Sequence, residues 1–70
     1  PDWERHHVQS LVRALDSLKP RDLELIELRF FEHRPFKEIA AIMEITESNA
    51  KVRTYRLLEK MKKKMYSHQP

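Results

Sequence analysis

The chain has 70 residues, with no cysteine and no glycine, and it carries 14 Lys or Arg against 11 Asp or Glu. This length allows one small domain, and the lack of cysteine excludes a disulfide framework and a thiolate metal site. Strong helix formers predominate, so we predict an all-α fold for residues 1–70. Neither a membrane span nor an export signal is recognisable, and we expect a cytoplasmic protein. Because the chain opens on Pro1 and not on Met, we expect a piece of a longer chain.

Charge is distributed unevenly along the chain. Residues 1–45 contain 7 Lys or Arg against 9 Asp or Glu, whereas residues 46–70 contain 7 against 2. The C-terminal part is therefore the side expected to meet an anionic partner. The alternative for Lys60 and residues 62–64 is that they only solvate an exposed helix.

The first half of the chain predicts two helices. Residues 1–4 read as a linker end in which Trp3 covers an edge of the core, and apolar spacing predicts a first amphipathic helix from about Arg5 to Leu18. Lys19 and Pro20 end it and open the second helix. Residues 23–31 are apolar on more than one side, which predicts a central helix packed by several neighbours.

Arg29 lies inside this apolar run, and a buried cation needs a partner. One interpretation pairs it with Glu27 or Glu32, or lets it snorkel to the surface. The other places it beside the basic C-terminal part of the chain, where it would bind a phosphate of the anionic partner.

Residues 32–34 then predict a turn, and Pro35 opens a short third helix from Phe36 to Met43. Glu44, Ile45 and Thr46 predict a tight turn, with Thr46 as the N-cap of a long last helix that ends at Met65. Asn49 does not complete a capping box. A short helix, a three-residue turn and a long basic helix indicate a helix-turn-helix at the end of a small four-helix domain.

The last helix has two different faces. One carries an apolar stripe that needs a core, and the opposite one carries small polar, cationic and aromatic groups that suit DNA. Residues 66–70 are predicted to be a frayed tail. The apolar stripe is Ala50, Thr54, Leu57, Leu58, Met61 and Met65; the outer face is Ser48, Lys51, Val52, Tyr55, Arg56 and Glu59.

In order and spacing, these elements resemble region 4, the C-terminal promoter-binding domain of bacterial sigma factors, most closely the extracytoplasmic-function group. Each mark is weak alone, but together they cover about two-thirds of the chain. The marks are Leu18 to Arg21, Leu28 to Glu32, Lys37 to Ala40, Ile45 with Thr46, and the spacing from Lys51, Val52 and Arg53 to Arg56.

The resemblance implies a function in transcription initiation. The helix-turn-helix would bind the minus-35 element of double-stranded promoter DNA in the major groove, and the domain would contact the beta-subunit flap of RNA polymerase in the bacterial nucleoid. An anti-sigma factor is a further possible partner. The implied base contacts come from Lys51, Val52, Tyr55 and Arg56, and the implied phosphate contacts from Arg29, Ser48, Asn49 and Arg53.

Two departures from the family pattern concern the DNA target more than the fold. Glu44 stands where the family often has Gly, and Ser48 and Ala50 replace a common Gly and Val.

The alternative function is a sigma-like decoy that binds an anti-sigma factor without reading DNA. A response-regulator helix-turn-helix ranks third, because that type typically lacks the Leu28 to Phe31 run. We expect neither an enzyme nor a cofactor or metal site, since no cluster of catalytic or metal-ligating residues is recognisable.

Overall fold

The computed structural model describes residues 2–66, with the side chains of residue 5 and residues 7–65. It contains α1 (Asp2–Asp16), α2 (Pro20–Ile26), the π-helix η1 (Glu27–Phe31), α3 (Phe36–Met43) and α4 (Glu47–Tyr66). Since η1 continues α2 without a break, the described residues form four helices, and the predicted all-α, four-helix fold is confirmed.

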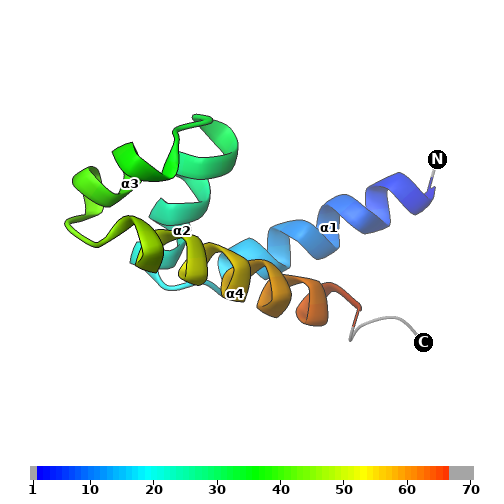
Figure 1. Ribbon diagram of the computed structural model, residues 1–70. Helices are drawn as coiled ribbons and strands as arrows, with labels where there is room; N and C mark the ends of the chain where they lie inside the picture. The colour runs from blue at the N-terminus through cyan, green and yellow to red at the C-terminus, as the bar shows by residue number, and fades with distance from the viewer. Residues whose placement is uncertain (1, 67–70) are drawn as a thin grey trace.

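Helix α4 is the element that the other helices pack against. Figure 1 shows α1 running antiparallel to it along its second half, while α2 and α3 gather around its first half. The domain is elongated, with extents of 40 × 19 × 16 Å. One side of α4 is thereby covered along most of its length, and the other side stays exposed.

The core lies where α2, α3 and α4 meet. Leu25 of α2 and Ile39 of α3 are 0% exposed, and burying a side chain of this size stabilises a fold by about 1.5–3 kcal/mol. On α4 the buried positions follow the predicted stripe, with the exceptions of Leu58, which is 38% exposed, and Met65, which is partly buried. The core residues are Ala14, Leu18, Leu25, Ile26, Leu28, Ile39, Met43, Ala50, Leu57 and Met61.

Helix α1 differs from its prediction in extent and in its buried face. It begins at Asp2, so residues assigned to a linker are helical; the side chain of Trp3 lies outside the described residues. Among the described side chains of α1, Ser10 and Ala14 are buried, and Leu18 is buried just after the helix, whereas Val8 is 59% exposed. Because α1 packs mainly on α4, these described side chains bury a narrow stripe, and the small Ser10 and Ala14 allow a close approach.

The second helix ends in a π-turn that the apolar pattern did not predict. The amide of Glu32 donates to the carbonyl of Glu27 at 3.0 Å, five residues back, and that of Arg34 donates to Leu28 at 3.0 Å. Phe31 is 63% exposed, so its expected place in a central, well-covered helix is wrong. The widened turn lies at the edge of the bundle, where neighbouring helices cover only its Leu28 side.

The third helix and the turn after it agree closely with the sequence. Helix α3 spans Phe36–Met43 as predicted, and Glu44 then adopts the left-handed conformation with φ 57° and ψ 46°. The amide of Ile45 donates to the carbonyl of Ala40 at 3.0 Å, and Ile45 packs against the core. Thr46 is the predicted N-cap, because its Oγ1 accepts the amide of Asn49 at 3.0 Å.

At its C-terminal end, α4 includes Tyr66, which the sequence assigned to the tail. Residues 67–70, the rest of that predicted tail, lie outside the described residues.

Two neighbouring residues in the first turn of α2 connect it to the helix-turn-helix. Arg21 Nη2 donates to the carbonyl of Met43 at 2.9 Å, which satisfies an otherwise free carbonyl at the end of α3. Asp22 accepts a hydrogen bond from Arg53 Nη2 of α4 at 3.3 Å, with the two side chains 19% and 29% exposed. The start of α2 therefore holds both α3 and α4 in place.

The left-handed turn residue gives a first prediction. Replacing Glu44 by Gly should raise the free energy of unfolding by about 1 kcal/mol, because Gly adopts this conformation without the clash of a Cβ atom. Urea unfolding followed by circular dichroism measures the change. Glu44→Ala, which removes the charge but keeps the Cβ, should show no such gain; an equal gain would assign the effect to charge.

The ion pair between Asp22 and Arg53 gives a second prediction. A double-mutant cycle with Asp22→Ala and Arg53→Ala should give a coupling energy of about 0.5–1 kcal/mol, at the upper end for ion pairs of this kind because both groups are partly buried. The exposed pair Glu47 and Lys51, at 4.0 Å, is the matched control and should couple less. Equal coupling in the two pairs would contradict a special role of Asp22.

Candidate nucleic-acid interface

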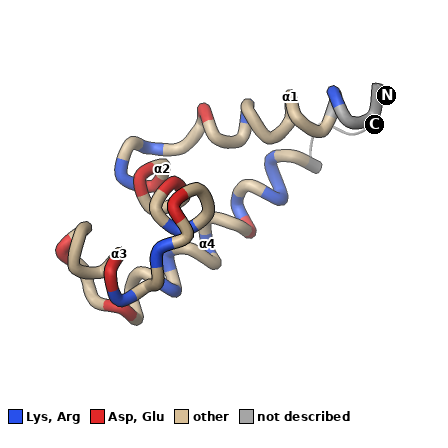
Figure 2. The backbone as a smooth tube through the Cα atoms, turned by 90° about the horizontal axis from the view of Figure 1, so that it is seen from above, with Lys and Arg blue, Asp and Glu red and all other residues tan. Residues whose placement is uncertain are grey.

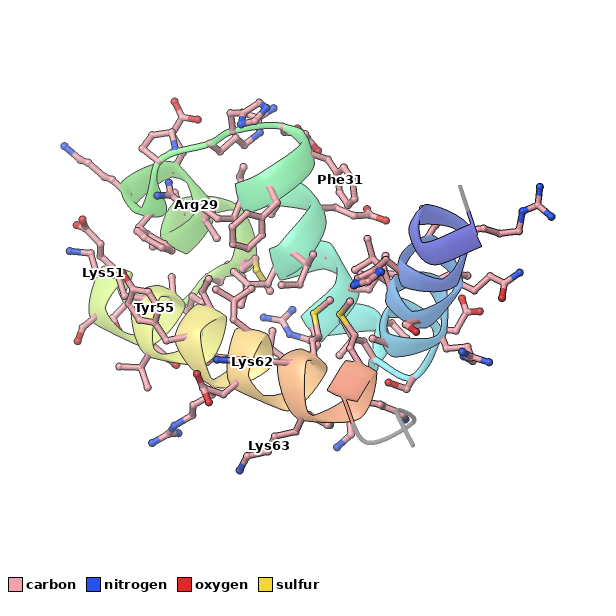
Figure 3. The ribbon with its side chains drawn as sticks, turned by 90° about the vertical axis from the view of Figure 1, so that its right-hand side faces the viewer. Arg29, Phe31, Lys51, Tyr55, Lys62 and Lys63 are labelled. Atoms are coloured by element: carbon pink, nitrogen blue, oxygen red, sulfur yellow. The ribbon has the colours of Figure 1, made fainter. Side chains whose placement is uncertain are left out.

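The predicted outer face of α4 is exposed as a unit. Its six residues, Ser48, Lys51, Val52, Tyr55, Arg56 and Glu59, are all exposed, and the buried stripe faces the opposite way. Figure 3 shows Lys51 and Tyr55 projecting from the same side of α4, away from α1. A single binding partner can therefore touch the whole face without any rearrangement of the core.

The four residues expected to contact bases are brought together by helical geometry. Lys51, Val52, Tyr55 and Arg56 lie within two turns, and Val52 and Tyr55 are 42% and 62% exposed. Their side chains offer two cationic donors, one apolar contact and one aromatic ring with a hydroxyl group. Such a mixture matches the acceptors and methyl groups in the major groove of DNA.

The first turn of α4 contains the two residues with short side chains that we expect to contact phosphates. Ser48 and Asn49 are exposed there, at the positive end of a 20-residue helix. The amide of Asn49 is already bonded to Thr46, so only its side chain is offered outward. Glu47 also lies in this turn, 4.0 Å from Lys51, and its carboxylate opposes the approach of an anion.

Arg29 is half-buried and serves the fold in the free protein. Its Nη1 donates to the carbonyl of Arg34 at 3.0 Å, and its guanidinium lies 4.1 Å from the centre of the Phe36 ring, in a cation–π contact. It thus joins the turn after η1 to the first residue of α3. The expected pairing with Glu27 or Glu32 is absent from the described contacts of Arg29, and its phosphate contact stays a prediction.

Arg53 is likewise separated from the outer face. Its side chain is only 29% exposed and points to Asp22. The arrangement therefore divides the eight predicted contact residues into six that share one surface and two arginines that have partners inside the domain. The roles of Arg21 and Asp22 were missed, because neither apolar spacing nor capping signals report contacts between helices far apart in the sequence.

The loop before α3 contains a small charged network. Arg34 forms ion pairs with Glu32 at 2.8 Å and with Glu38 at 3.3 Å. The hydrogen bond to Glu32, followed by the charge of that carboxylate, raises the pKa of Arg34 above its ordinary value. Arg34 therefore stays cationic while its charge is locally balanced, which leaves it a weaker competitor for phosphate than the residues of α4.

The positive charge of the domain follows α4. Figure 2 shows Lys and Arg along this helix, whereas most Asp and Glu lie on the other helices. In the described part of the chain, no group of three or more His, Asp or Glu side chains is arranged to hold a metal ion. Within the same residues, no helix is long and apolar enough to cross a membrane.

Comparison with known proteins gives one match. The family model described as sigma-70, region 4 matches residues 8–61 of the 70-residue chain, which takes in the second half of α1, all of α2, η1 and α3, and residues 47–61 of α4 with its outer face. No curated protein and no solved structure matches the chain. This family consists of promoter-binding domains that act in transcription initiation and are not enzymes. The chain belongs to the sigma-70 region 4 family.

Proposed function

We propose that this domain binds the minus-35 element of double-stranded promoter DNA through the outer face of α4, as part of an extracytoplasmic-function type of sigma factor. The observation that carries the proposal is the exposure of Lys51, Val52, Tyr55 and Arg56 on one side of the second helix of a helix-turn-helix, opposite a buried stripe. In proteins of this architecture, the second helix enters the major groove with its N-terminal residues toward the bases.

Each side chain has a chemically suited target. Lys51 and Arg56 donate to the O6 and N7 acceptors of guanine, and Arg56 can do so with two parallel hydrogen bonds. Val52 and the ring of Tyr55 meet thymine methyl groups. Asn49 has the amide that pairs with adenine, should the first turn lie deep enough in the groove.

Phosphate contacts would fix the position of the domain on the duplex. Ser48 and Asn49 are suited to this at the start of α4. Arg29 and Arg53 would have to exchange the carbonyl of Arg34 and the carboxylate of Asp22 for a phosphate. Each arginine would gain a phosphate contact and lose its contact inside the domain. Its contribution to DNA affinity is therefore smaller than that of an arginine without such a partner.

A second surface fits the contact with RNA polymerase. An apolar groove of about 210 Å³ lies between α1, the end of α2 with η1, and α4, and exposed apolar surface of this kind marks protein contacts. We assign the beta-subunit flap to this groove, and an anti-sigma factor would compete for the same surface. With these partners, we expect the protein to act at the bacterial nucleoid. The groove is lined by Leu11, Leu15, Ile26, Phe30, Phe31, Leu58 and Met61.

Selection on randomised DNA duplexes at low salt tests the DNA contact. We expect the wild-type chain to enrich one short motif, and the variant Lys51→Ala/Arg56→Ala to enrich none, since removing a side chain that reads a base weakens binding by about 1–3 kcal/mol. The control Arg5→Ala/Arg13→Ala removes the same charge from α1 and should select the wild-type motif.

Enrichment of the same motif by the Lys51→Ala/Arg56→Ala variant would overturn the assignment of the outer face. If the folded wild-type chain enriches nothing while it binds an anti-sigma factor, the decoy function replaces promoter binding.

Binding to an isolated flap fragment tests the groove. Phe31→Glu should weaken this binding by about 2 kcal/mol, because a charge replaces a large apolar side chain, while the DNA affinity stays unchanged. Phe31 is 63% exposed, so the fold should tolerate the change. Ile42→Glu, on α3 and outside the groove, is the control. Equal weakening by both variants would show that the flap does not use this groove.

A further inference from the structure

The lysines at the end of α4 do not form one patch. Figure 3 shows Lys62 and Lys63, neighbours in the sequence, pointing in different directions from the helix. At about 100° per residue, Lys60 and Lys63 are separated by about 60° around α4, whereas Lys62 is about 160° from Lys60. Lys62 lies about 40° from Leu58, which lines the apolar groove, and about 20° from Lys51 and Tyr55 on the outer face.

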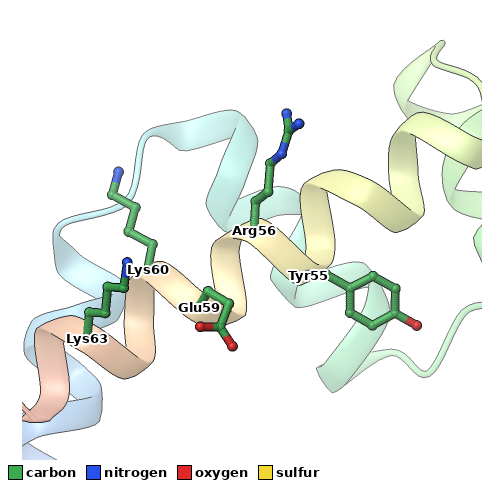
Figure 4. A pocket seen from close by; sticks show the side chains of 5 residues that line it. All are labelled: Tyr55, Arg56, Glu59, Lys60 and Lys63. Atoms are coloured by element: carbon green, nitrogen blue, oxygen red, sulfur yellow. The ribbon is translucent and has the colours of Figure 1, made fainter.

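Lys60 and Lys63 continue a row that begins with Arg56. These three residues, the basic row, follow the spacing i, i+4 and i+7, and all are exposed. They line a shallow depression of about 410 Å³ together with Tyr55 and Glu59. In Figure 4 the three cationic side chains extend to one side of α4, whereas Tyr55 and Glu59 extend to the other. The carboxylate of Glu59 therefore leaves the cationic side open.

The position of the row along α4 is suited to a phosphate strand and not to bases. With a rise of about 1.5 Å per residue, Lys60 and Lys63 lie about 12 and 17 Å beyond Val52 along the helix axis. The major groove is only about 12 Å wide, so its edge lies about 6 Å from a side chain at its centre. A straight helix also cannot follow a groove that winds around the duplex. The second half of α4 must leave the groove and cross one of the strands that border it.

We propose that Lys60 and Lys63 bind the phosphates of one DNA strand and extend the contact surface of the domain beyond its base-reading half. The inference rests on the proposed promoter binding. The contact of Lys60 and Lys63 with phosphates adds DNA affinity that is independent of sequence, because a lysine that binds a phosphate contacts no base. Lys62, about 160° from Lys60 around α4, is not part of this row.

The salt dependence of DNA affinity tests this inference. Titrations of the full 70-residue chain at several salt concentrations, on a selected duplex and on a scrambled one, should give a smaller slope of log affinity against log salt for Lys60→Ala/Lys63→Ala. The expected reduction is about 1.8, or about 0.9 for each phosphate that is no longer neutralised, and it should be equal on both duplexes. Arg5→Ala/Arg13→Ala, which removes the same charge from α1, should keep the wild-type slope, and Lys60→Arg/Lys63→Arg, which retains the charge, should keep it as well.

An unchanged slope in Lys60→Ala/Lys63→Ala, or an equal reduction in Arg5→Ala/Arg13→Ala, would overturn the phosphate contact even when the wild type prefers the selected duplex. Conversely, a wild type that binds both duplexes equally, with the reduced slope still present in the double variant, would support the phosphate contact and contradict promoter reading. Circular dichroism of each variant establishes that α4 remains helical.

Discussion

The burial of one narrow stripe fixes the rotation of α4 about its own axis, and the positions of both candidate binding surfaces depend on that rotation. Ala50, Leu57 and Met61 are held in the core by α1, α2 and α3, and buried Thr54 bonds back to the carbonyl of Ala50 at 2.8 Å. A slip of one residue would turn the helix by about 100° and move Tyr55 toward the core. The small Ala50 lets α3 cross closely at the point where this rotation is set.

Local signals predicted the helix-turn-helix well. Pro35 before an apolar stretch marks α3, and Thr46 before a long basic segment marks the start of α4, because both residues act on the backbone next to them. The outer face followed from periodicity, since α4 has its core on one side only. These predictions needed no knowledge of how distant segments pack.

Other features could not be predicted, because they depend on which helices become neighbours. Nothing around Arg53 or Asp22 reports that residues 31 positions apart form an ion pair. Arg29 is comparable: its two partners, the Arg34 carbonyl and the Phe36 ring, come together only once the turn after η1 has formed. Val8, Leu11 and Val12 of α1 are exposed because this helix packs mainly on α4, and apolar periodicity alone does not reveal which neighbours a helix has.

The π-turn of η1 changes the direction in which the side chains after it point from the helix. A π-turn accommodates one residue more than an α-helical turn, and each residue of an α-helix advances the side-chain direction by about 100°. Removing one residue from this turn and closing it as an α-helix would therefore rotate Phe31 relative to Leu25 and Ile26, which anchor α2 in the core. The direction in which Phe31 lines the apolar groove therefore depends on this shift of helical register, and not only on the presence of an aromatic residue. If η1 were one residue shorter, Phe30 and Phe31 would still be present, but their side chains would no longer point into the groove in the same direction.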